Sequence, residues 1–177
     1  ADAQVPLTLR EVCDLTTVEI ARAFLSAPAA IAQRIVRAKA KIRDAKIPYQ
    51  VPTLNELPER LDSVLRVIYL VFNEGYSATS GDDWTRPALC EEALRLGRML
   101  AALAPREPEV HGLIALMEIQ ASRLHARVGK DGAPVLLLEQ DRSRWDRLLI
   151  QRGLEALSRA ERLGGALGPY ALQAAIA

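Results

Sequence analysis

The sequence predicts an all-α protein, in which a helix-turn-helix DNA-binding module is followed by an antiparallel helical array. Two observations predict this class. Only 5% of the 177 residues are aromatic, and alanine, leucine and arginine dominate. Apolar residues also recur three and four positions apart, which is the helical period. Half of the residues are hydrophobic and a quarter are charged, the usual balance of a globular domain.

The first 46 residues predict three short helices. A short helix precedes Thr16, which with Glu19 forms a capping box and begins a second helix. That helix stops at residues 25–27. Pro28 then suits the first turn of a third helix, because its missing N–H would have no partner there, and this helix runs to about Ala45.

The third helix has an apolar stripe with a basic row beside it. The stripe consists of Ile31, Ile35, Ala38 and Ile42, spaced by four, three and four residues. Arg34, Arg37 and Lys41 fall within about 60° of one another on the helix. Between residues 34 and 46, six basic side chains stand against one acidic side chain. This pattern is typical of a surface that binds a polyanion, and it is equally typical of an ordinary solvated helix face.

Two prolines, Pro48 and Pro52, end the helical run and favour extended backbone before them. We therefore expect a helix-turn-helix domain over residues 1–46, a linker over 47–53 and a helical C-terminal domain over 54–177.

The second domain predicts longer helices. One begins at Asn55 or Pro58 and ends near Phe72, where a polar loop, Asn73–Trp84, follows. Further helices are expected over residues 85–103, 108–128 and 142–163, and another begins near Pro169.

A faint internal repeat lies within these helices. Two sets of residues have nearly the same spacing, that of the second helix of a tetratricopeptide unit: Ala93, Gly97, Leu100 and Pro105, then Ala156, Ala160, Leu163 and Pro169. Tetratricopeptide-like helix pairs and a generic antiparallel helical array both remain open.

The sequence contains none of the residue patterns that are typical of catalytic or metal-binding sites. His111 and His125 are the only histidines and form no metal-binding motif, and Cys13 and Cys90 form no CxxC pair. No glycine-rich phosphate loop occurs. We expect no enzyme activity, no metal and no cofactor, and two buried free thiols in a reducing cytoplasm. No apolar run approaches the ~20 residues of a membrane helix, so no membrane contact is expected.

Several blocks resemble a known family. The runs Leu15–Phe24 and Ile31–Arg43 resemble the helix-turn-helix in region four of extracytoplasmic-function sigma factors of bacterial RNA polymerase. The blocks Ile47–Tyr49, Leu70–Ser77 and Asp141–Asp146 resemble the subgroup that carries a long C-terminal extension with tetratricopeptide-like repeats. The resemblance covers nearly the whole chain.

The resemblance implies that the third helix enters the major groove of the −35 promoter element. Its DNA-binding residues would be Gln33, Arg34, Arg37, Lys39, Lys41 and Arg43. The cations would lie near phosphates or base edges, and Gln33 could hydrogen-bond a purine. The chain departs from the family at two places. Residues 27–30 are apolar where polar residues are usual, and Leu25 stands where glycine is common.

The resemblance also implies partners. These are promoter DNA, the RNA polymerase core and a protein or peptide partner of the C-terminal domain, which would regulate the factor from within the same chain. Tyr76 and Trp84 are the candidate residues for that partner. The domain that melts the −10 element has no counterpart here, so we expect a piece of a longer protein. The alternative is a helical protein–protein scaffold whose helix-turn-helix no longer binds DNA.

Overall fold

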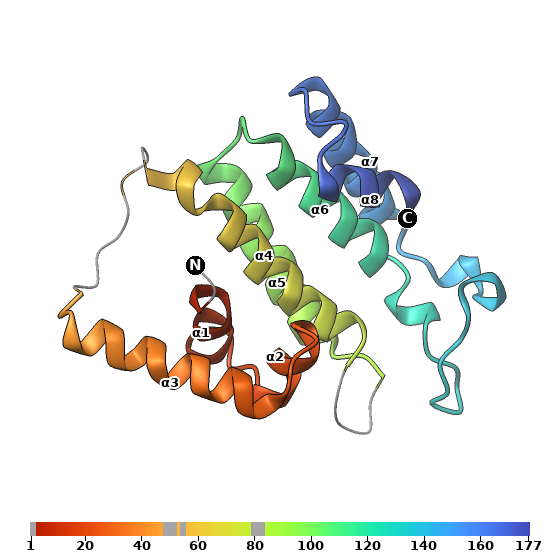
Figure 1. Ribbon diagram of the computed structural model, residues 1–177. Coiled ribbons are helices and arrows are strands. Elements are labelled where there is room, and N and C mark those ends of the chain that lie inside the picture. The colour runs from red at the N-terminus through yellow and green to blue at the C-terminus, as the bar shows by residue number, and fades with distance from the viewer. Residues whose placement is uncertain (1–2, 48–52, 54–55, 79–83) are drawn as a thin grey trace. The chain divides into compact units, whose positions relative to one another are not determined.

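The computed structural model describes residues 3–47, 53, 56–78 and 84–177. These residues form helices joined by turns, which confirms the all-α class (Figure 1). Within the described residues the only β-type pairing is an isolated bridge between Val128 and Pro134. None of the described helices has the length and apolar character needed to cross a membrane.

The chain divides into two compact units, Ala1–Val71 and Phe72–Ala177. Most of the expected linker, residues 48–52, lies outside the described residues. The domain boundaries 1–46, 47–53 and 54–177 therefore stay a prediction.

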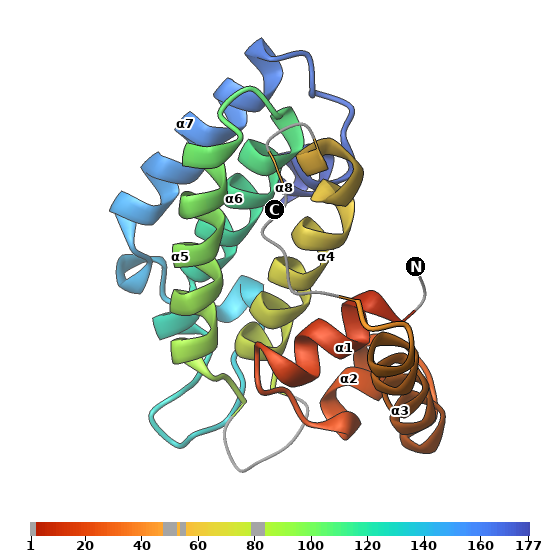
Figure 2. The same ribbon diagram turned by 90° about the vertical axis from the view of Figure 1, so that its left-hand side faces the viewer.

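The first unit holds α1 (Gln4–Glu11), α2 (Thr17–Ala23), α3 (Pro28–Asp44) and the first part of α4 (Leu57–Tyr76). Both α1 and α2 pack against α3, and they lie on the same side of it in both views (Figures 1 and 2). Four fully buried side chains form the core of this packing: Leu9, Leu15, Ile20 and Ile31.

The second unit is built around α6. Its helices are α5 (Pro87–Leu103), α6 (Pro108–Ala121), α7 (Arg147–Arg162) and α8 (Pro169–Ile176). Short 3-10 turns, η2 (Leu124–Ala126), η3 (Leu137–Glu139) and η4 (Arg142–Arg144), lie between α6 and α7. Because α5, α7 and α8 all pack against α6, every residue from Val110 to Ile119 is buried. Figure 1 shows α6 between α5 and the pair α7 and α8.

Close packing of α7 on α6 depends on a glycine. A Cβ atom on Gly153 would lie 2.6 Å from Ile119 Cγ1 and 3.2 Å from the backbone oxygen of Ala115. A side chain at this position therefore requires the Ile119 side chain to move and the backbone of α6 to shift slightly.

A partly buried ion pair joins α5 to α6, in which Glu118 is buried and the Arg98 side chain is 45% exposed. Both Nε and Nη2 of Arg98 donate to Oε1 of Glu118, at 3.0 and 2.8 Å. The Glu118 side chain is only 3% exposed, so the pair removes most of its charge from water. Removing Arg98 would leave that carboxylate buried without a partner, which proteins tolerate poorly.

The predicted loop over residues 73–84 is wrong at its start, because α4 continues to Tyr76. Gly75, which suggested a turn, is a packing residue inside the helix. A Cβ atom there would lie 2.7 Å from the backbone nitrogen of Cys90, and the Gly75 carbonyl accepts a hydrogen bond from the Arg86 N–H at 2.7 Å. Residues 79–83 of the predicted loop lie outside the described residues.

Two other helix boundaries differ from prediction. The expected helix over 108–128 stops at Ala121, where the carbonyl of Ser122 accepts the backbone N–H of Asp146 instead of a helical donor. The expected helix over 142–163 begins only at Arg147. The carboxylate of Asp146 accepts the N–H groups of the first turn and caps the helix there.

The Gly153 contact can be tested by Gly153→Ala. Glycine-to-alanine changes inside helices ordinarily stabilise by about 1 kcal/mol. Here the added methyl group meets α6, so we expect a loss of about 1–3 kcal/mol in the free energy of unfolding, measured in urea. Ser158→Ala, at an exposed position of α7, is the control and should change little. A stabilised Gly153→Ala variant would contradict the close packing.

Candidate nucleic-acid interface

The segment from Thr16 to Asp44 forms two helices, α2 and α3, joined by a short turn, as the sequence predicts. Thr16 and Glu19 make the expected capping box: the Thr16 hydroxyl accepts the Glu19 N–H at 3.3 Å, and the Glu19 carboxylate accepts the Thr16 N–H. This reciprocal pair fixes where α2 begins. Pro28 occupies the first turn of α3, also as predicted.

The turn between α2 and α3 contains a strained leucine. Leu25 has a φ of +47° and is 95% exposed. The Leu25 and Ser26 N–H groups donate to the carbonyls of Arg22 and Ala21 at 3.0 and 2.8 Å, which is a Schellman motif. The turn thus keeps the geometry that glycine favours. Gly164 ends α7 in the same way, with a φ of +86°.

Two isoleucines anchor α3 to its unit. Ile31 is fully buried and Ile35 is 7% exposed. The predicted stripe was expected to continue through Ala38 to Ile42, but Ile42 is 40% exposed. The reason is that the last turns, from Lys41 to Asp44, are exposed on every side. The buried part of α3 is therefore its N-terminal half.

All six predicted DNA-binding residues are exposed side chains of α3: Gln33, Arg34, Arg37, Lys39, Lys41 and Arg43. At about 100° per residue, the three cations Arg34, Arg37 and Lys41 lie along one flank of the exposed surface. Lys39 and Arg43 lie along the opposite flank. The structure thus distributes the predicted set over two basic rows rather than one.

The ion pairs within this surface are weak. Lys39 Nζ lies 2.9 Å from Glu11 Oε1, Arg43 Nε lies 3.0 Å from Asp44 Oδ1, and Arg37 Nη2 donates to Gln33 Oε1 at 3.3 Å.

Exposed pairs of this kind contribute about 0–1 kcal/mol, so a phosphate oxygen can replace either carboxylate. Arg34 and Lys41 form no hydrogen bond or ion pair within the described part of the chain, so their charges are available to an anion.

The candidate partner residues of the second unit differ in exposure. The Tyr76 ring stacks on Phe72 with centroids 5.7 Å apart, and the Arg127 Cζ atom lies 3.8 Å from the Tyr76 centroid. Tyr76 is therefore partly covered by its own unit. Trp84 is 53% exposed and lies next to the residues that the structure does not describe.

The structure adds an arginine–tryptophan cluster that sequence reasoning did not assemble. The Cζ atoms of Arg123 and Arg142 lie 5.0 and 5.5 Å from the centroid of the Trp145 ring. Cation–π contacts of this kind hold the η2 and η4 turns together. Trp145 is half-buried just before α7, as expected of a helix-start anchor. The arginine at position 123 is separated from it by a long stretch of sequence, so no local pattern pointed to the contact.

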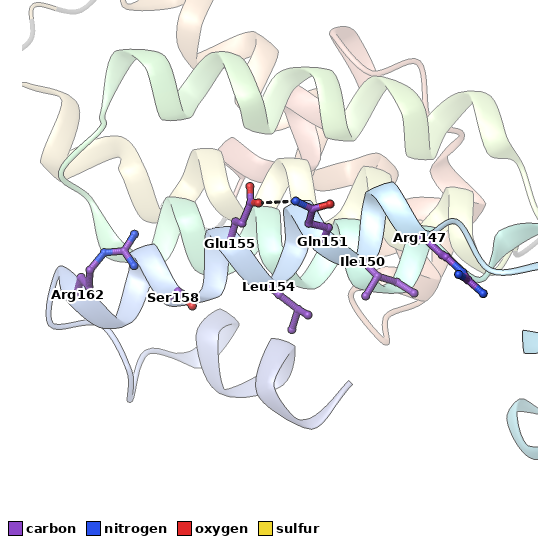
Figure 3. A pocket seen from close by; sticks show the side chains of 7 residues that line it. All are labelled: Arg147, Ile150, Gln151, Leu154, Glu155, Ser158 and Arg162. Atoms are coloured by element: carbon purple, nitrogen blue, oxygen red, sulfur yellow. Dashed lines mark hydrogen bonds between the residues drawn. The ribbon is translucent and has the colours of Figure 1, made fainter.

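A shallow pocket of about 500 Å³ lies on the outer face of α7 (Figure 3). Its lining is Arg147, Ile150, Gln151, Leu154, Glu155, Ser158 and Arg162. Gln151 Nε2 donates to Glu155 Oε1 at 2.9 Å. One helix supplies the whole lining, so the pocket brings no distant residues together, and none of the predicted site residues is in it.

The cysteine and histidine side chains differ in burial and in their hydrogen-bond partners. Cys90 is buried, and that burial raises the pKa of its thiol from 9.0 to about 12. Cys13 is half-buried, less than expected. His111 is buried, and its Nε2 atom lies 3.0 Å from the Pro105 carbonyl, so Nε2 carries the proton. No group of three or more metal-ligating side chains occurs among the residues that the structure describes.

Residues 60–161 match the model of a protein family described as "Family of unknown function (DUF6596)". The chain belongs to this DUF6596 family. The family's domain is found in sigma-factor-like proteins. The chain is also 49% identical, over all 177 residues, to an uncharacterized protein of Rhizobium meliloti (strain 1021), and it spans 42% of that protein's length. No solved structure matches the chain.

The strained turn of this DUF6596 protein can be tested by Leu25→Gly. A non-glycine residue in the left-handed region destabilises the folded state by about 1–2 kcal/mol. Glycine removes this strain, but its greater backbone entropy in the unfolded chain offsets part of the gain. We expect the free energy of unfolding to rise by about 0.5–1 kcal/mol. Gly164→Ala makes the reverse change in the matching turn and should lower it by about 1 kcal/mol. A Leu25→Gly variant that is less stable would contradict the strain.

The raised pKa of Cys90 predicts selective alkylation. The thiolate is the reactive form, and the folded chain keeps Cys90 protonated up to about pH 12. Between pH 8 and 10, iodoacetamide should label Cys13 and leave Cys90 intact, as read by peptide mass spectrometry. In urea both cysteines should react. Equal labelling of the two cysteines in the folded protein would contradict the burial of Cys90.

Proposed function

We propose that this chain is part of a bacterial RNA polymerase sigma factor, and that α3 contacts the −35 element of promoter DNA. The role is non-catalytic and cytoplasmic, with the polymerase core as a second partner. The C-terminal helices would regulate the factor or bind a protein or peptide.

One observation carries the proposal. Ile31 and Ile35 hold the inner face of α3 against its unit, and all five cations of the predicted set lie on its outer surface. A helix in the major groove meets phosphates along both of its flanks. The two basic rows suit that geometry, whereas a merely solvated helix needs no such excess of one charge sign.

The resemblance and the comparisons add support. The helix-turn-helix runs and the three C-terminal blocks resemble one subgroup of extracytoplasmic-function sigma factors, and the DUF6596 domain is found in sigma-factor-like proteins. Because the chain spans only 42% of its Rhizobium meliloti relative, the activity of a whole protein of this kind is part of the proposal.

A second candidate function is a helical protein–protein scaffold. The outer face of α7 favours it, because Ile150 and Leu154 line an open pocket there and Leu154 is 53% exposed. Exposed leucines on a helical array are typical of partner surfaces. In that case the basic rows of α3 would only keep the module solvated.

The two functions can be separated by titrating duplex DNA at several salt concentrations. Each phosphate contact contributes about −0.9 to the slope of log K against log salt. The double reversal Arg37→Glu/Lys41→Glu should abolish measurable binding. Arg152→Glu/Arg162→Glu, on exposed positions of α7, changes the net charge equally and should leave binding nearly unchanged. If both double variants bind as the unchanged chain does, α3 is not the DNA surface and the scaffold is favoured.

A further inference from the structure

The outer surface of α3 has an uncharged centre between its two basic rows. This line consists of Ala29, Gln33 and Val36, spaced by four and three residues. At about 100° per residue it lies roughly 120–180° away from the buried line of Ile31 and Ile35. The three uncharged side chains therefore lie at the centre of the face opposite the anchor of α3, and Arg37 and Arg43 lie at its two edges.

Val36 is the prominent member of this line. Its side chain is 65% exposed, and it lies on a helix whose other large apolar residues in the N-terminal half, Ile31 and Ile35, are buried. A single exposed valine is ordinary by itself. Here Val36 has the row of Lys39 and Arg43 on one side and the amide of Gln33 on the other. The centre of the exposed surface is the part of a major-groove helix that faces the base edges.

Gln33 is oriented by its neighbour. The Arg37 guanidinium donates to Gln33 Oε1 at 3.3 Å, so the amide oxygen has a partner and the amide NH₂ group points its two donors elsewhere. A free amide donor next to a branched methyl group matches one base edge. Thymine presents an acceptor, O4, beside a methyl group at C5.

The C-terminal half of the same line is unsuited to bases. Asp44 falls close to the line of Gln33, and its carboxylate would repel DNA, although Arg43 partly neutralises it. Base contact is thus confined to the first three turns of α3. In helix-turn-helix proteins the N-terminal residues of the recognition helix are the ones that contact base edges.

We propose that α3 distinguishes promoter sequences chiefly by apolar contact of Val36, one turn from Gln33, to a thymine methyl group, while its cations contact phosphates. This inference rests on the proposed function, and it assigns the sequence preference to Val36 rather than to the cations.

The experiment uses the full 177-residue chain. Duplexes are first selected from a random library, and each thymine of the selected site is then replaced in turn by uracil, which removes only the C5 methyl group. Binding is measured by fluorescence anisotropy. Losing one buried methyl contact should weaken binding about fourfold at one or two positions.

Val36→Ala supplies the matched control. It should weaken binding to the thymine duplex about as much, and uracil should then cause no further loss at the same position. Arg37→Ala should instead weaken binding to every duplex and reduce the salt slope by about 1, with the methyl effect retained. Circular dichroism shows whether the variants keep their helices.

Two outcomes count against the inference. Binding that is equal for thymine and uracil, or a uracil effect that persists in Val36→Ala, overturns it while the proposed DNA binding stands. Failure of the unchanged chain to bind any duplex overturns the proposed function itself.

Discussion

The burial of Ile31 and Ile35 is the constraint on which the first unit depends. Two adjacent turns of α3 are fixed against α1 and α2 by these side chains, so the rotation of α3 about its own axis is fixed as well. Every other residue of the helix then has a defined direction. The two basic rows and the line of Ala29, Gln33 and Val36 follow from this anchor.

The second unit depends on a different kind of burial. There α6 is covered on all sides, and its neighbours approach closely because glycine and alanine stand at the contacts. The buried carboxylate that α6 contributes, that of Glu118, is compensated by Arg98. An apolar central helix gives stability to the array and leaves the outer helices to present side chains to solvent.

Much of the fold could be predicted from the sequence, because its signals are local. A capping box, a proline in a first turn and an apolar period each act within a few residues, and the bounds of α2 and α3 and the start of α8 followed from them. The local signals gave wrong helix ends where contacts with residues distant in the sequence determine the boundary. Gly75 suggested a loop but is packed against Cys90, and the end of α6 depends on Asp146, far along the chain.

The candidate site shows the same division. Helical periodicity predicted that the cations of α3 would be exposed, and they are. It could not predict which of them have partners. Lys39 pairs with Glu11 because α1 packs beside α3, a tertiary contact without a sequence pattern. Tyr76 was expected on a surface, but Arg127 partly covers it. The likeness to tetratricopeptide pairs stays a prediction, since no solved structure matches.

The position of α6 in the chain has a consequence for synthesis on the ribosome. It is made before α7 and α8, the two helices that cover much of its surface. At translation rates of about 5–20 residues per second, the nascent chain displays an apolar helix for several seconds before that cover exists. A nascent chain from which α6 has emerged, but on which α7 and α8 have not yet packed, is therefore a suitable substrate for chaperones that bind exposed apolar segments.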